Sequence, residues 1–281
     1  MNNLKFNNLM VNGVEIYHNA KEVIYPNGYT KLKVANKPIY RENGYEKSMC
    51  YNSETEKVSK PQAKGNEPRE DSVKRAKQKI FDIIMLNEFK YFVTFTFNGE
   101  KINRTNEKEI LKKVSHYLKN RVQRQGFKYI LVPEYHKDGE AIHIHALMSG
   151  DLKLVDSGTR LVKGHKKPLK ISTMQRLHIP LENGRIVYNM SDWSYGFSEV
   201  VEIYGQTENC AKYITKYITK DVKKIFGKFY LSGGSLIRNP EQVIFDVDYD
   251  TIEAKEYECQ ATHTKFKFVD YKTERNDKSD F

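Results

Sequence analysis

Two groups of residues have types and spacings that could do chemistry, and the first is a repeat. The run from Tyr213 to Lys220 writes Tyr-Ile-Thr-Lys twice. Four residues are about one helical turn, so Tyr213 and Tyr217 share a face, and Lys216 and Lys220 fall within the same arc of about 100°. A phenol needs activation to act as a nucleophile, and a neighbouring cation favours its phenolate form. The run therefore indicates a tyrosine nucleophile for a phosphate substrate, with a plain surface helix as the alternative.

The second group is His143-Ile144-His145, which lies between two apolar, β-branched segments. We expect residues 129–135 and 141–148 to pair as a hairpin, because an Asp-Gly dipeptide separates them. Residues two apart on a strand share a face, so His143 and His145 point together and the partner strand can bring Glu134 opposite them. Two imidazoles and one carboxylate suit Mn²⁺ or Mg²⁺ with positions left for substrate. The alternative is two histidines held by hydrogen bonds in the core.

Other metal chemistries fit the sequence less well. The three cysteines, Cys50, Cys210 and Cys259, are far apart and form no CxxC pair, which disfavours a structural zinc site. A β-barrel oxygenase of the cupin type also uses His-x-His, but it needs a glutamate shortly after the second histidine. Here Ala146 to Gly150 follow, and none of these residues is acidic.

Three motifs in this order resemble the HUH endonuclease superfamily, which includes the rolling-circle replication initiators. The first is the threonine-containing strand 92–98, and the second is the His-x-His strand with Glu134 nine residues before His143. The third is the helix with the repeated Tyr-x-x-Lys. The doubled tyrosine is similar to the two-tyrosine subgroup of initiators from plasmids and single-stranded DNA phages. The resemblance covers roughly residues 70–240.

The resemblance implies an α+β fold, with a palm-like antiparallel sheet of about five strands and flanking helices. It implies metal-dependent nicking and rejoining of single-stranded DNA through a 5′-phosphotyrosine, which leaves a 3′-OH primer. Tyr213 and Tyr217 would be the nucleophiles, and Lys216 and Lys220 would offset phosphate charge and lower the phenol pKa. The metal, Mg²⁺ or Mn²⁺, would be held by three side chains, those of Glu134, His143 and His145.

The same resemblance implies the partners and the place of action. The substrate would be single-stranded DNA at a replication origin, presented as a hairpin or within a double-strand origin. A helicase and a polymerase would come from the bacterial host, in whose cytoplasm the protein would act. Residues expected to position DNA are Thr94, Thr96, Lys166, Lys167 and Lys212.

Composition agrees with a nucleic-acid partner. The 281 residues carry 47 Lys and Arg against 36 Asp and Glu, a net charge of +11. A basic excess attracts polyanions, and the 19 Tyr and 14 Phe include possible stacking surfaces for unpaired bases. No apolar run approaches 18 residues, so no transmembrane helix is expected. Charge alone also fits an RNA-binding or ribosome-associated protein.

Periodicity and turn residues place the elements along the chain. We expect an N-terminal β-rich extension and linker over 1–70, an endonuclease domain over 71–245, and a C-terminal extension with a disordered tail over 246–281. The segment 150–184 is expected to be irregular and basic, and residues from Tyr271 onward to be disordered. The expected helices are 72–89, 105–125 and 208–226, and the expected strands of the central domain are 91–98, 129–135, 141–148 and 198–204.

Two competing classes stay open. A transposase or a relaxase of the same superfamily would use the same chemistry for another purpose, although small transposases carry one tyrosine and relaxases tend to place it before the histidines. A non-enzymatic, basic nucleic-acid-binding protein would need neither metal nor tyrosine. Its binding would fall with salt and ignore a chelator.

Overall fold

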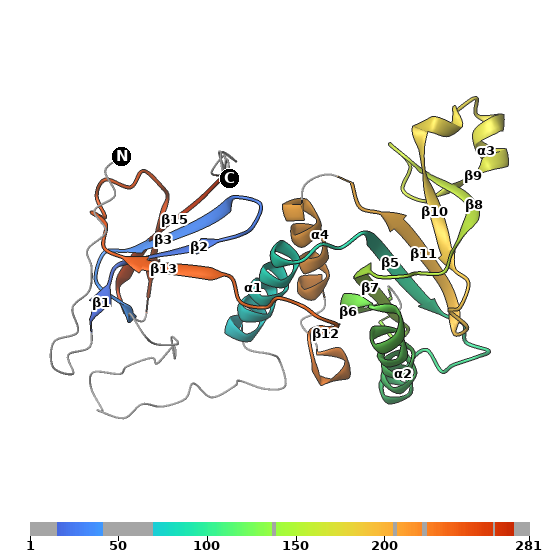
Figure 1. Ribbon diagram of the computed structural model, residues 1–281, viewed down its shortest axis with the longest axis horizontal. Coiled ribbons are helices and arrows are strands. Elements are labelled where there is room, and N and C mark those ends of the chain that lie inside the picture. The colour runs from blue at the N-terminus through green and yellow to red at the C-terminus, as the bar shows by residue number, and fades with distance from the viewer. Residues whose placement is uncertain are drawn as a thin grey trace, which may run out of the picture. The chain divides into compact units, whose positions relative to one another are not determined.

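The computed structural model describes residues 16–41, 70–136, 139–204, 207–220, 224–260 and 262–272; of residues 208 and 216–220 only the helical backbone is described. The chain divides into two compact units (Figure 1). Unit 1 combines Met1–Gln62 with Pro240–Phe281, and unit 2 is Ala63–Asn239. The two ends of the chain, which were expected to form separate extensions, therefore contribute strands to one unit.

Unit 2 is built on one antiparallel sheet of eight strands in the order β12-β6-β7-β5-β11-β10-β8-β9. The strand that carries His143 and His145, β7, lies beside β5, as the resemblance implied. The strands are β5 (Tyr91–Phe97), β6 (Lys128–Tyr135), β7 (Ile142–Ser149), β8 (Leu154–Val162), β9 (Leu169–Lys170), β10 (Gly184–Met190), β11 (Gly196–Glu202) and β12 (Leu231–Gly233).

One face of this sheet is apolar and carries helix α2 (Glu107–Gln125). Alternate residues of β5 and β7, such as Phe95 and Ile144, are fully buried there against Ile110 and Val114 of the helix. The helix begins at Asn106, whose side chain accepts a hydrogen bond from the backbone of Glu109, and ends at Gly126 in the left-handed region. This packing fixes the strands, and so it fixes the direction of every side chain on the opposite face.

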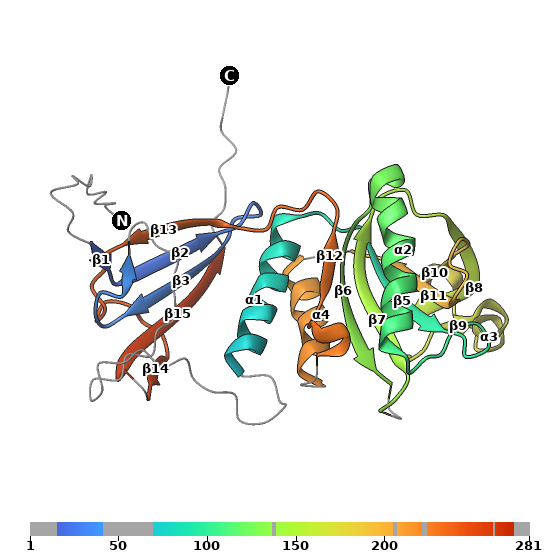
Figure 2. The same ribbon diagram turned by 90° about the horizontal axis from the view of Figure 1, so that it is seen from below.

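The opposite face is covered by α4 (Thr207–Lys220), against which α1 (Glu70–Leu86) packs (Figure 2). Ile214 of α4 and Ile80 of α1 are both fully buried. The tyrosine helix therefore lies on the face to which β7 turns its histidines. After Lys220 the helix does not extend to residue 226 as expected, because Lys224 is in an extended conformation and Phe226 has a positive φ of 60°.

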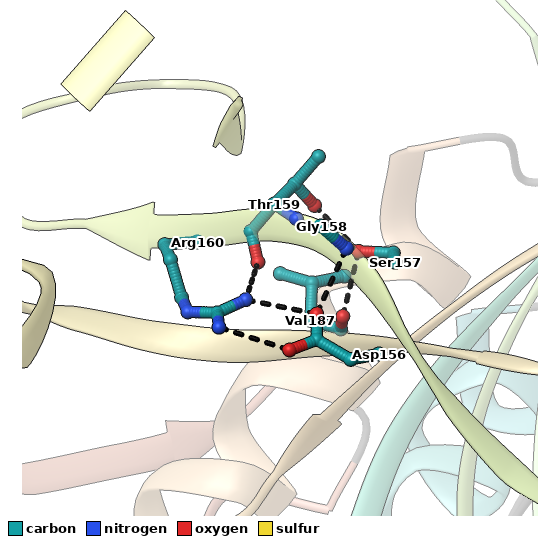
Figure 3. A network of polar contacts seen from close by, with 6 residues as sticks. All are labelled: Asp156, Ser157, Gly158, Thr159, Arg160 and Val187. Carbon is teal, nitrogen blue, oxygen red and sulfur yellow. Dashed lines mark hydrogen bonds and ion pairs between the residues drawn. The ribbon is translucent and has the colours of Figure 1, made fainter. Parts of the chain in front are cut away.

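Strand β8 contains a bulge that the sequence analysis took for an irregular loop. Its register against β10 shifts between Val187 and Tyr188, and Gly158 has a φ of 70°. Asp156 accepts two hydrogen bonds from the Arg160 guanidinium, both of 2.9 Å, and one from the Gly158 backbone (Figure 3). These bonds, the Arg160 bond first, lower the pKa of the Asp156 carboxyl. The Asp-Ser-Gly sequence suggests a turn, but the polar network keeps it within a strand.

The segment 150–184 is therefore ordered and not irregular. It forms β8, β9, the short helix α3 (Ile171–Arg176) and a 3-10 turn, η1 (Leu181–Asn183), before β10. These strands extend the sheet to eight where about five were expected. A second 3-10 turn, η2 (Ile225–Gly227), follows the tyrosine helix.

Unit 1 is a separate antiparallel sheet of five strands in the order β13-β2-β3-β15-β14, with a small pair of β1 and β4. Tyr271 and Lys272, expected to be disordered, belong to strand β15; residues 273–281 lie outside the described part. The turn expected at 26–28 is present, with Gly28 at a φ of 79°. The strands are β1 (Tyr17–His18), β2 (Ala20–Ile24), β3 (Tyr29–Ala35), β4 (Tyr40–Arg41), β13 (Glu241–Phe245), β14 (Glu256–Cys259) and β15 (Thr264–Lys272).

Candidate functional site

The candidate site begins with two rows of residues that cross the sheet of unit 2. In the first row, Thr96 of β5 lies opposite His143 of β7, which lies opposite Glu134 of β6. In the second row, Thr94 lies opposite His145. Directly opposite residues of antiparallel strands share a face, so all five side chains point to the side covered by α4. The expected hairpin register is confirmed by this pairing.

His145 is held from both sides of its ring. Its Nε2 lies 2.9 Å from Oε2 of Glu134, and its Nδ1 lies 3.3 Å from Oγ1 of Thr94. The Glu134 side chain is only 7 % exposed and that of His145 13 %. The imidazole is therefore fixed in orientation by a carboxylate and a hydroxyl in a nearly buried position.

His143 makes different contacts although it lies opposite Glu134. Its Nδ1 is 3.4 Å from Oγ1 of Thr96, and its ring stacks on that of His136 with centroids 4.8 Å apart. Burial lowers the pKa of His143, and the neighbouring His136 and His145 lower it further. A lowered pKa favours the neutral imidazole, which is the form that binds metals.

The donor set fits a divalent cation in chemistry, and two of its three members already meet. An octahedral ion with ligands at about 2.1 Å keeps adjacent ligands about 3 Å apart, close to the 2.9 Å between Glu134 and His145. His143 faces its two contacts on β5 and the hairpin turn, so within the described residues no three His, Cys, Asp or Glu side chains gather closely enough to hold a metal. Cross-strand neighbours have Cβ atoms about 5 Å apart, so a side-chain rotation of His143 suffices to complete the set.

Tyr213 of α4 reaches the same region through an aromatic contact. Its ring meets that of Phe92 edge to face, with centroids 5.4 Å apart, and Phe92 in turn stacks on His145 at 5.9 Å. Phe92 shares the face of Thr94 because it lies two residues earlier on β5. Tyr213 is 49 % exposed, so its phenol is accessible from solvent.

A cavity of about 500 Å³ unites these groups. His145, Thr94, Phe92 and Tyr213 line one part of it, and the strands β8, β10 and β11 provide the rest. The remaining lining residues that bear charge or an exposed ring are Lys166, Arg185, Glu199, Glu202 and Tyr204. A histidine from the sheet and a tyrosine from the helix therefore open into one space large enough for part of a nucleotide.

The charges around this cavity are mixed. Lys166 and Arg185 supply two cations, whereas Glu199 and Glu202 supply two carboxylates. Arg185 also lies over the ring of Tyr204, with its Cζ 4.9 Å from the centroid. A phosphate entering this space meets carboxylates as well as cations, so its approach is favoured by any further positive charge.

Several predicted residues lie outside this geometry. Tyr217, Lys216 and Lys220 belong to α4, but their side chains fall outside the described residues. Lys212 and Lys167 are exposed and do not line the cavity, whereas Lys166 does.

The sequence analysis missed Phe92 and the second wall of the cavity. Phe92 is signalled by its spacing of two from Thr94, but its position next to a helix 120 residues later leaves no local pattern. Arg185 was missed because β10 was not predicted. Phe197, 70 % exposed and directly opposite Thr96, also lies on the face of the two histidines.

The fold and the site together define a class: an α+β unit whose antiparallel sheet presents a His-x-His strand to a helix bearing an accessible tyrosine. Residues 90–222 match the model of the family described as Replication-associated protein ORF2, a rolling-circle replication initiator family. The matched segment begins just before β5, ends just after α4 and lies within unit 2. The match supports a Rep-type identity, a role in replication initiation and DNA binding at an origin.

Searches of curated proteins and of solved structures gave no match. Within the described residues, no helix is long and apolar enough to cross a membrane.

Proposed function

We propose that the protein initiates rolling-circle replication by nicking single-stranded DNA at an origin and rejoining it through a phosphotyrosine. One observation carries the proposal: His145 and Tyr213, from motifs about 70 residues apart, line the same cavity. A structural histidine pair would not need an accessible phenol beside it. The family matched by residues 90–222 supports the same direction.

The proposed reaction exchanges one phosphodiester for another. The Tyr213 oxygen forms a bond to phosphorus while the bond from phosphorus to the 3′ oxygen breaks. The phenol loses its proton to solvent, and the departing 3′ oxygen gains one and becomes a primer end. Because the phosphotyrosine preserves the phosphodiester energy, a 3′-OH can later attack it and reseal the strand without ATP. Tyr217, one helical turn away, is proposed as the second nucleophile of the two-tyrosine subtype.

The chain's own residues would orient the strand for this attack. Phe92 holds the Tyr213 ring against the sheet, and Lys166 and Arg185 attract the phosphate backbone. The hydroxyls of Thr94 and Thr96 fix the two imidazoles by their contacts of 3.3 and 3.4 Å. In this proposal the threonines act on the histidines first.

Glu134, His143 and His145 would hold Mg²⁺ or Mn²⁺. When bound, the ion would polarise the scissile phosphate and offset the carboxylates around the cavity. The buried Glu134 carboxylate gives this site its negative charge. A helicase and a polymerase of the bacterial host are proposed to extend the 3′ end, on a plasmid or phage replicon.

The test is formation of a covalent adduct on labelled single-stranded DNA that carries the origin of the protein's own replicon. Wild type is compared with Tyr213→Phe, Tyr217→Phe and the double variant, in Mn²⁺ and in EDTA, on a denaturing protein gel. We expect a metal-dependent band that disappears in the double variant. Tyr257→Phe, which removes a hydroxyl in unit 1, is the matched control and should keep the band. Tight binding of the correct origin without an adduct in any metal would exclude the nuclease and leave a basic DNA-binding protein.

A further inference from the structure

We infer that unit 1 carries a second site for single-stranded DNA, on the face of its sheet formed by Tyr257, Phe266, Phe268, Lys33 and Lys255. This aromatic–lysine face lies outside the segment that matches the replication family. The inference does not depend on the nicking reaction proposed for unit 2.

Strand register places these side chains on one face. Tyr257 of β14 lies opposite Phe266 of β15, and Phe268 of β15 lies opposite Lys33 of β3. Phe266 and Phe268 are two residues apart and therefore point the same way. Lys255 lies two residues before Tyr257, and its Nζ lies 5.3 Å from the centroid of that ring.

The aromatic rings form a cluster that stays open to solvent. Tyr257 and Phe268 are each 49 % exposed, and their rings meet edge to face at 5.6 Å. Phe266 lies beside Phe268 at 6.3 Å in a nearly parallel arrangement. Two half-exposed rings in contact offer flat apolar surface that a core would bury, and unpaired bases stack on such surface whatever their sequence.

Lysines are interleaved with the rings. The Nζ of Lys33 lies 4.5 Å from the centroid of Phe266 and 5.8 Å from that of Phe268. Lys33 is also directly opposite Lys21 of β2. Like charges directly opposite on neighbouring strands destabilise a sheet, and a bound polyanion removes that cost.

Charge distinguishes this face from the reverse face and selects the occupant. By register, the described strands β2, β3 and β15 place on this face Lys21, Lys31, Lys33 and Lys272 with one carboxylate, Asp270, which accepts a hydrogen bond from Tyr29. On the reverse face lysine is paired with acid, as in the 2.9 Å contact of Lys265 with Glu256. A second copy of the chain would bring lysine against lysine, whereas a single strand of DNA supplies both bases and phosphates.

The test measures binding of a fluorescein-labelled (dT)12 strand to the full chain in EDTA, which prevents metal-dependent cleavage. Wild type is compared with Tyr257→Ala/Phe268→Ala and with Tyr17→Ala, a matched control that removes a ring 45 % exposed on β1. Loss of a stacking aromatic weakens binding by roughly 5- to 150-fold per base. We expect at least a tenfold weaker Kd for the double variant and no change for the control. Phe268→Trp should bind at least as well as wild type, because the indole provides a larger stacking surface.

Two further measurements assign the site. Photocrosslinking of a strand containing 5-iodo-deoxyuridine should label the peptide over residues 255–268. Lys33→Gln should reduce the slope of log Kd against log salt by about 0.7, the value of one phosphate contact on a single strand. Circular dichroism checks that each variant remains folded. A double variant that binds like wild type, or crosslinks confined to other segments, would overturn the inference. Absence of nicking with these results intact would remove only the function proposed for unit 2.

Discussion

Replacing Phe92 by alanine tests whether the tyrosine helix is held in place by the histidine strand. Phe92 makes two ring contacts, with His145 at 5.9 Å and with Tyr213 at 5.4 Å. An aromatic pair contributes about 0.5–1.5 kcal/mol beyond the buried area. Truncation of a fully buried Phe costs about 3–5 kcal/mol. Phe92 is only partly buried, so we expect unfolding free energy to fall by about 2 kcal/mol and Tm by about 5 °C.

The effect on nicking should be larger than this loss of stability predicts. Misplacement of a reacting group by about 1 Å can lower a rate about 100-fold, and Phe92→Ala frees the Tyr213 ring. The assay is single-turnover adduct formation at a temperature where both proteins are folded. Val114→Ala, in the core on the opposite face, should cost a similar 2 kcal/mol, roughly, without slowing the reaction. Adduct formation at the wild-type rate in Phe92→Ala, with the expected loss of Tm, would refute the positioning role.

Further predictions concern other parts of unit 2. Glu134→Gln should weaken Mn²⁺ binding at least tenfold in calorimetry, because a neutral amide replaces a buried carboxylate; equal affinity would contradict the proposed ligand set. Phe197→Ala should raise the apparent KM for the nicked strand more than it changes kcat, if this exposed ring stacks on a base; an effect on kcat alone would argue against stacking. Asp192→Asn should cost about 2 kcal/mol in urea unfolding, because the carboxylate accepts two hydrogen bonds from Arg121; an unchanged midpoint would show the pair to be neutral. Gly196→Ala should lower Tm, because its Cβ would meet the backbone of β5 at 2.1 Å.

The sequence predicted the elements whose residues repeat with a clear period. Strand β5, helix α2 with Gly126 at its end, and the β6–β7 register all follow from local alternation or capping. Strands β8 and β10 were missed because Asp156, Ser157 and Gly158 suggest a turn. Their order depends on hydrogen bonds between residues 30 apart, such as that from the Ser157 hydroxyl to the Val187 carbonyl.

The candidate site was predictable as motifs but not as a cavity. Types and spacing identified Glu134, His145 and Tyr213, because each belongs to a short periodic pattern. The contact of Phe92 with Tyr213 joins segments 121 residues apart, and the cavity wall at Arg185 depends on a strand that no local pattern announced. Partners of this kind are selected by tertiary packing, which a single sequence does not display.

The pairing of β3 with β15 has a consequence for the birth of the protein on the ribosome. Tyr29 pairs with Lys272, so the two strands are separated by 243 residues (272 − 29). At roughly 5–20 residues per second, about 10–50 s pass between their syntheses. Unit 2 is completed within that interval and can fold first, whereas the sheet of unit 1 must wait for the last strands. A nascent chain therefore acquires its two units in a fixed order, and a truncated translation product carries a complete unit 2 with an unfinished unit 1.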